Sequence, residues 1–278
     1  MRWSCTLVAA VTVIAGSLAS ADNSDLEVEI EQLFGSDAQP PPKFAFSNGD
    51  VYTTKVRRPR IGGMQLGEMA SVAKAVIATS KDGTVAWVAS DVSVGCDPQA
   101  VSECTAGIGT PLHATGLLVK ASKGWQWIAW HFAEVTDAKE QAALVKRGVV
   151  PDPLQRSVTG AEDLATLFEQ TLAEPKALVA SVSDRKDVVL YGTSLAERVV
   201  GGAKVKAKLK RWNLSFKVRD GVRAGLASAT VGWVAANVDG SSQGKAASAS
   251  PYRVLAIYEK SPTAWKLVQL HFSVDSAN

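Results

Sequence analysis

Two stretches rich in tryptophan and histidine hold the residues most able to do chemistry. WQWIAWHF spans 125–132, and WKLVQLHF spans 265–272 with the same spacing between its tryptophan and its His-Phe pair. A histidine changes charge near neutral pH, so His131 or His271 could act as a general acid or base, or donate to a bound carbonyl. The alternative, which the apolar surroundings favour, is that both are buried, hydrogen-bonded residues of a packed strand.

Other reaction classes lack their defining residues. SVAK at 71–74 matches the S-x-x-K of serine acyl enzymes, but the S-D-N and K-T-G motifs that should accompany it are missing. The sequence has no G-x-S-x-G, no H-E-x-x-H and no phosphate-binding glycine loop. Its three histidines, at 113, 131 and 271, are divided between two halves of the chain. We therefore expect neither a metal site nor a cofactor.

The two tryptophan–histidine stretches belong to a longer internal repeat. TVAWVASDV (84–92) matches TVGWVAANV (230–238), and GLLVKASKGWQWIAWHFAEV (116–135) matches AIYEKSPTAWKLVQLHFSV (256–274). Each half also begins with a capping box before an apolar run, Ser24-x-x-Glu27 and Thr159-x-x-Glu162. Matches in the same order predict a duplication, with units at 22–137 and 159–278. Residues 138–158 form a linker that begins with a short charged helix.

The order of elements within a unit predicts an α+β fold. In the second unit, leucine and phenylalanine recur at helical spacing between 164 and 172, and a second helical stripe follows Gly201-Gly202. Four strand-like segments then follow, separated by turn signals such as Asp239-Gly240. Helices followed by consecutive hairpin strands predict an antiparallel sheet.

Alternation along the two closing strands predicts which side chains share a face. A regular strand would place each histidine on the same side as the tryptophan that precedes it. The two predicted faces are Trp125, Trp127, Ala129 and His131 in the first unit, and Trp265, Leu267, Gln269, His271 and Ser273 in the second.

The N-terminus has the pattern of an export signal. Arg2 is followed by an apolar run and by the small residues Ala19-Ser20-Ala21, which predict cleavage after Ala21 and a periplasmic or secreted protein. An oxidising compartment favours a disulfide between Cys96 and Cys104 over free thiols or metal ligands. No other stretch is long and apolar enough to span a membrane, and a net charge of +3 is too small to indicate nucleic-acid binding.

The closing stretches GWQWIAWHFA and AWKLVQLHFS resemble those of the nuclear transport factor 2-like superfamily, most closely its SnoaL-like branch, in two tandem copies. The resemblance implies two cone-shaped units, each a curved antiparallel sheet wrapped around N-terminal helices and an apolar pocket. It also implies that the duplication forms an internal pseudo-dimer. Members of the superfamily include isomerases, cyclases, dehydratases and binding domains without activity, so the fold does not select a function.

The second unit is expected to hold the ligand, because it keeps Ser273 where the first has Ala133. We predict a non-catalytic protein that binds a small apolar molecule or a protein partner. The pocket is expected to be lined by Trp212, Trp233, Trp265, Gln269, His271 and Ser273.

The alternative is an isomerase or cyclase-like enzyme in which His271 and Tyr258 act as acid and base on a hydrophobic carbonyl substrate. The resemblance makes other carboxyl and phenol groups candidates too: Asp91, Asp187, Tyr191 and Tyr252. The lysines from Lys204 to Lys210 are expected to form a solvated helix face, with contact to an anionic partner as the second possibility.

Overall fold

The computed structural model describes residues 75–94, 110–135, 153–242 and 250–274, five short strands between 44 and 72, and single residues between 137 and 146. The predicted leader, the first-unit capping box, the Cys96–Cys104 pair and most of the linker lie outside the described residues. Within the described parts, no helix has the length and apolar character needed to span a bilayer.

The first half of the chain forms a seven-stranded sheet in the order β2-β1-β9-β8-β7-β5, with β6 also paired to β7. Its neighbours are antiparallel except for β1, which runs parallel to β9. A separate pair, β3 (Arg60–Ile61) and β4 (Met64–Gln65), lies apart from this sheet. The strands are β1 (Phe44–Phe46), β2 (Val51–Thr53), β5 (Ala70–Val72), β6 (Val76–Thr79), β7 (Val85–Val94), β8 (Thr110–Ala121) and β9 (Gly124–Glu134).

The second half forms another seven-stranded sheet, in the order β10-β13-β14-β15-β16-β11-β12. The long strands are antiparallel, while the short strands β10 and β11 run parallel to β13 and β16. The strands are β10 (Ser157–Thr159), β11 (Val189–Tyr191), β12 (Arg198–Val200), β13 (Leu214–Leu226), β14 (Val231–Ser242), β15 (Ser250–Lys260) and β16 (Trp265–Ser273). The antiparallel α+β character expected from the sequence is therefore present.

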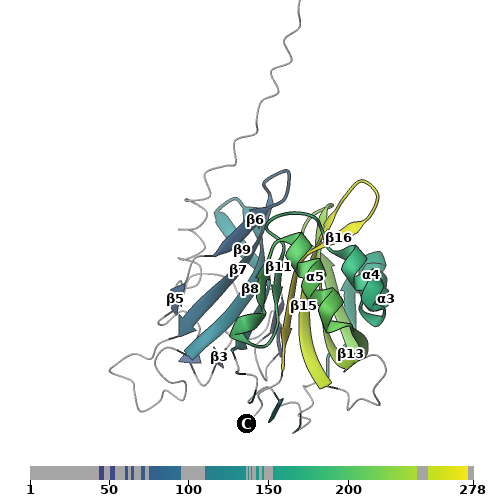
Figure 1. Cartoon of the computed structure of the whole chain (residues 1–278). Coiled ribbons are helices and arrows are strands. Elements are labelled where there is room, and N and C mark those ends of the chain that lie inside the picture. Colours follow the sequence, from purple (N-terminus) through teal and green to yellow (C-terminus); the bar gives the residue numbers. More distant parts are fainter. Residues whose placement is uncertain are drawn as a thin grey trace, which may run out of the picture.

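Three helices cover one face of the second sheet: α3 (Glu162–Ala173), α4 (Pro175–Ser181) and α5 (Gly202–Trp212) (Figure 1). The predicted leucine stripe is buried against the sheet, with Leu164, Phe168 and Leu172 at most 1% exposed. Helix α5 ends at Asn213 in the left-handed conformation, which suits an asparagine cap. The predicted capping box at Thr159 is wrong, because Thr159 lies in β10 and the N-cap of α3 is Ala161 without a side-chain cap.

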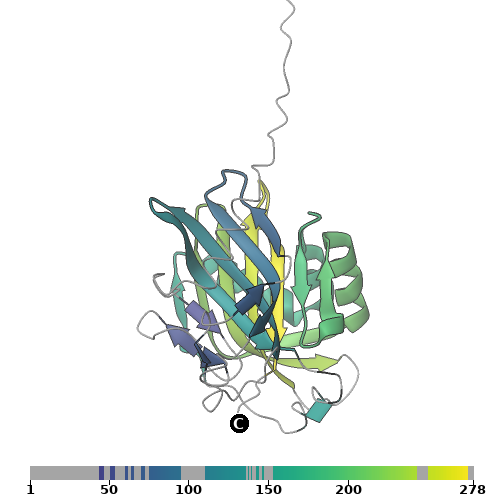
Figure 2. The same ribbon diagram turned by 90° about the vertical axis from the view of Figure 1, so that its left-hand side faces the viewer.

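The opposite face of the second sheet packs against the first sheet (Figure 2). One buried apolar cluster contains Trp87, Leu117 and Ile128 from the first sheet together with Trp233, Ile257 and Val268 from the second. We refer to this contact between the two sheets as the seam. Strands of the second sheet are apolar on both faces because one face meets the helices and the other meets the seam.

A β-bulge in each closing strand overturns the predicted alternation. The β8–β9 register skips Ile128, and the β15–β16 register skips Val268. An extra residue in one strand moves every side chain after it to the other face. Trp125 and Trp127 therefore share a face with Trp130 and Phe132, as the ring contacts of Trp130 with Trp127 and Phe132 confirm, and His131 faces the seam.

Candidate functional site

All three histidines meet at the seam, although they are distant in sequence. The rings of His131 and His271 stack with centroids 4.0 Å apart, and His113 lies edge-on to His271 at 6.2 Å. Within the described ranges, no three His, Cys, Asp or Glu side chains form a group that could hold a metal ion. The rings lie against one another instead of converging on one point, so the arrangement is a packed stack.

Two hydrogen bonds join the sheets at this stack. His131 Nε2 lies 2.8 Å from Ser273 Oγ, and His271 Nδ1 lies 2.9 Å from Thr115 Oγ1. Each histidine thus reaches a hydroxyl on the opposite sheet. Buried polar groups need such partners, so these pairs fix how the two sheets sit on each other.

Both stacked histidines are kept neutral. Burial lowers the pKa of His131 to about 3, and the charge of Arg253 adds to the effect. Burial also lowers the pKa of His271 well below its usual value, with further contributions from the two other histidines. Both residues are fully buried. A buried imidazole that resists protonation is a poor proton carrier near neutral pH.

A charged cluster lies at one edge of the seam, around Asp91. Its carboxylate accepts from Tyr191 Oη at 3.1 Å and from Arg198 Nη1 at 2.5 Å, and it lies 3.0 Å from His113 Nδ1. Burial opposes ionisation of Asp91, but the His113 hydrogen bond and the Arg198 charge outweigh it, so the pKa of Asp91 is lowered. The pKa of Tyr191 is raised by burial and by the Asp91 charge. The contacts among these four residues join the two sheets. We call Asp91, His113, Tyr191 and Arg198 together the latch.

The sequence does not predict the latch as a unit, although Asp91 and Tyr191 are separate candidates there and His113 is one of the three histidines. Asp91 and His113 are direct neighbours in the β7–β8 register, and Tyr191 and Arg198 face each other across β11 and β12. The latch joins these two pairs across 100 residues of sequence, which no local pattern indicates. The other acidic candidate, Asp187, forms a pair with Arg185 at 2.7 Å instead.

The predicted pocket residues are divided between the two faces of the second sheet. Trp233, Gln269, His271 and Ser273 lie at the seam, whereas Trp212 and Trp265 pack with the core beneath the helices. Tyr258 is also in that core, and burial raises its pKa. His271 and Tyr258 therefore lie on opposite sides of the sheet and cannot act together on one substrate.

The space between the second sheet and its helices is filled by aromatic rings. Phe216 stacks on Phe272 at 4.8 Å, and Tyr252 and Trp212 each pack edge-on against Phe272. A cavity of about 80 Å³ remains beside these rings, and Glu197 and Thr193 contribute to its lining. Small-molecule sites have volumes of about 300–1,000 Å³, so this cavity is too small for such a ligand.

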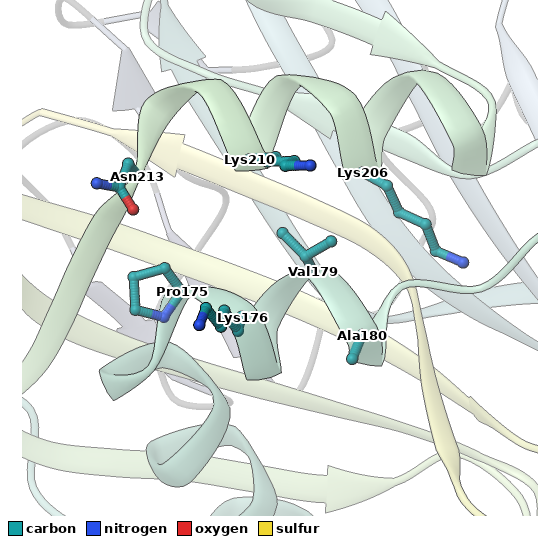
Figure 3. A pocket seen from close by; sticks show the side chains of 7 residues that line it. All are labelled: Pro175, Lys176, Val179, Ala180, Lys206, Lys210 and Asn213. Atoms are coloured by element: carbon teal, nitrogen blue, oxygen red, sulfur yellow. The ribbon is translucent and has the colours of Figure 1, made fainter.

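A larger hollow lies on the outside, between α4 and α5 (Figure 3). Its volume is about 600 Å³, and we call it the helical groove. Val179 points from α4 into the gap toward α5, and lysines from both helices surround it. The lining consists of Pro175, Lys176, Val179, Ala180, Lys206, Lys210 and Asn213. An apolar floor with a cationic rim can hold a molecule that is itself apolar and anionic.

Comparisons with known proteins give structural similarity only. No family model matches the sequence, and no curated protein matches it either. A proposed ketosteroid isomerase from Parabacteroides distasonis covers 42% of this chain and 89% of its own, with 18% identity and a TM-score of 0.34. The chain resembles nuclear transport factor 2-like proteins.

Two further structures of that type have no stated function. An NTF2-like protein from Pseudomonas putida covers 40% of this chain and 83% of its own, at 13% identity and a TM-score of 0.33. One from Shewanella oneidensis covers 41% and 99%, at 14% identity and a TM-score of 0.33. These likenesses are of fold, over less than half of the chain. Scores of this size carry no inference about activity.

Proposed function

We propose that the protein is a non-catalytic binding protein made of two tandem nuclear transport factor 2-like units, and that it binds a partner through the helical groove. The observation that carries the proposal is the contrast between the two hollows. The interior of the second unit is filled with rings around about 80 Å³, whereas the outer groove offers about 600 Å³. We also propose that the chain is exported, with cleavage after Ala21 and a Cys96–Cys104 disulfide.

Equivalent strand orders support the tandem arrangement. The run β2-β1-β9-β8-β7 in the first sheet corresponds to β12-β11-β16-β15-β14 in the second. In both, a short strand runs parallel to the closing strand and ends opposite its histidine, with Phe46 beside His131 and Tyr191 beside His271. The bulges also occupy equivalent positions in the two closing strands.

The seam supports an internal pseudo-dimer. In a two-fold interface, equivalent residues contact each other at the axis. His131 and His271 are equivalent by sequence and stack on one another, and Trp87 and Trp233 are equivalent and share one apolar cluster. The seam thus fits the interface of a duplicated dimer, in which the histidines serve packing. Packing at this interface is sufficient to explain why both repeats keep the same spacing between tryptophan and histidine.

The enzyme alternative has less support. It requires His271 to exchange protons with Tyr258, and the sheet separates these two side chains. His271 is also fully buried, and its Nδ1 is occupied by Thr115. The half-buried Asp91 latch is ionised and held by three partners, an arrangement that favours a structural role over proton transfer.

Site-specific photo-crosslinking in the producing organism tests the proposed function. A photoreactive amino acid replaces Ala180, which lines the groove, or Ala203, which is also exposed but lies on α5 outside the groove. We expect a discrete crosslinked product from position 180 and none from position 203. Filling the groove by Val179→Trp should remove that product while leaving the thermal unfolding midpoint nearly unchanged. Equal products from both positions, or none from position 180, would contradict binding at the groove.

A further inference from the structure

We propose that the helical groove binds an acidic amphipathic helix of a partner protein. This inference rests on the proposed function and specifies the chemistry of its partner. The groove has two properties that select such a ligand: an unusual accumulation of positive charge, and apolar side chains that lie within the hollow.

The charge of α4 and α5 is entirely of one sign. The two helices together carry six basic residues and no acidic one: Lys176, Lys204, Lys206, Lys208, Lys210 and Arg211. The net charge of the whole chain is only +3, so this cluster exceeds the total. Like charges at helical spacing destabilise an isolated helix, so the pattern is unfavourable for folding unless another group supplies negative charge.

Only part of this charge is neutralised within the described chain. Lys206 pairs with Asp184, and Lys208 lies 3.7 Å from Glu197. In the same described ranges, Lys176 and Lys210 have no acidic partner, and both line the groove, one from each helix. Two unneutralised cations on opposite walls can reach carboxylates on both flanks of a segment lying between them.

The floor is apolar and recessed. Pro175, Val179 and Ala180 come from α4, while the aliphatic stems of Lys206 and Lys210 cover the wall formed by α5. Figure 3 shows Val179 directed into the gap between the two helices, with the lysines at its margins. An amphipathic helix placed in such a groove buries its apolar stripe on the floor and presents its polar flanks to the rim.

The same geometry argues against a membrane surface. A membrane-binding helix projects its apolar side chains outward into the acyl boundary. Here the apolar residues lie in a hollow between two helices, so a flat bilayer would meet only the lysine rim. A helical segment, by contrast, has the convex shape that enters the hollow.

Fluorescence anisotropy with a designed peptide tests the inference. The probe is about 16 residues long, with leucine at i, i+3, i+4 and i+7 spacing and glutamate at the other positions. It is titrated with the chain from residue 22 onward. In the test variant, Lys176→Glu and Lys210→Glu reverse the rim. In the matched control, Lys81→Glu and Lys123→Glu make the same change in net charge at exposed turns of the first unit.

We expect the rim variant to raise the Kd about tenfold relative to wild type, and the control variant to change it less than about threefold. Raising the salt concentration from about 50 to about 500 mM should weaken wild-type binding and have less effect on the rim variant. Circular dichroism confirms that each variant is folded. Equal Kd values for the rim and control variants would overturn the acidic-helix inference.

Two comparisons separate this inference from the proposed function. A probe with lysine in place of glutamate should not bind; equal binding of both probes would refute the acidic class. The crosslink at residue 180 can also be measured in the rim variant. If it persists there, the groove remains the binding site, but its selectivity for acidic helices is refuted. Stronger binding to anionic phosphatidylglycerol vesicles than to the peptide would replace the helix by a membrane and so refute the inference.

Discussion

The neutral His131 ring makes the stability of the protein depend on pH in a predictable direction. Its pKa is about 3 in the folded chain and 6.5 in an unfolded one. A group with a lowered folded pKa binds its proton only on unfolding, so acid favours the unfolded state. The stability that neutral His131 provides is complete above pH 6.5 and is lost as the pH falls from there toward 3.

The size of the effect follows from the same two values. At pH 4.5 an unfolded chain carries a proton at this position almost all of the time, whereas the folded chain does not. Two pH units below 6.5, at about 1.4 kcal/mol per unit, give a loss of about 3 kcal/mol. The side chain is fully buried, so this free energy is not reduced for screening by solvent. A His131→Gln variant has no charge to gain and should lack this component.

Urea unfolding of both proteins at pH 7.5 and pH 4.5 measures the difference. The wild-type free energy of unfolding should fall between these pH values by about 3 kcal/mol more than that of His131→Gln. The variant at pH 7.5 serves as its own control, because any packing cost of the substitution is present at both pH values. Parallel losses in the two proteins would refute the assignment of His131 to a buried seam.

Three other substitutions test the packing. Phe272→Ala should lower the free energy of unfolding by about 3–5 kcal/mol in urea denaturation and enlarge the cavity, because Phe272 is only 2% exposed; a loss below about 1 kcal/mol would show that the interior is open. Gly116→Ala should lower the free energy of unfolding by about 1–3 kcal/mol in the same assay, since a new Cβ would lie 2.3 Å from Trp127. No change would contradict the packing of Trp127 against Gly116. Asp91→Asn should lower the free energy of unfolding by about 1–3 kcal/mol in the same assay, because the carboxylate holds the buried Tyr191 hydroxyl and His113 ring as well as Arg198; no change would contradict its role in joining the two sheets.

The sequence predicted the helices and strands of the second half of the chain better than it predicted which way their faces point. Helical stripes and β-rich segments correctly indicated α3, α5 and the hairpin strands, because local periodicity is the main signal for both. The prediction that His271 lies on the same side of its strand as Trp265 is wrong. One inserted residue, Val268, reverses the alternation, and no residue type in WKLVQLHF marks it as a bulge.

The candidate site was even harder to predict from the sequence. Gln269, His271 and Ser273 do face the same way, as expected, but they face the other sheet and not an interior pocket. Which face of a doubly apolar strand meets a second sheet depends on contacts between distant segments. The groove between α4 and α5 depends on the spacing of two helices, and only its lysines were visible in the sequence as a charged face with a possible anionic partner.

Ring-nitrogen NMR of protein carrying ¹⁵N-labelled histidine tests most directly whether His131 and His271 form a buried seam. The expected result is that both rings keep the shifts of neutral imidazole from pH 8 to pH 5, with a nuclear Overhauser contact between their ring protons, as the 4.0 Å stack requires. Titration of both rings near pH 6.5 without such a contact would contradict the packing of the two sheets and return the histidines to solvent, where acid–base chemistry is open to them.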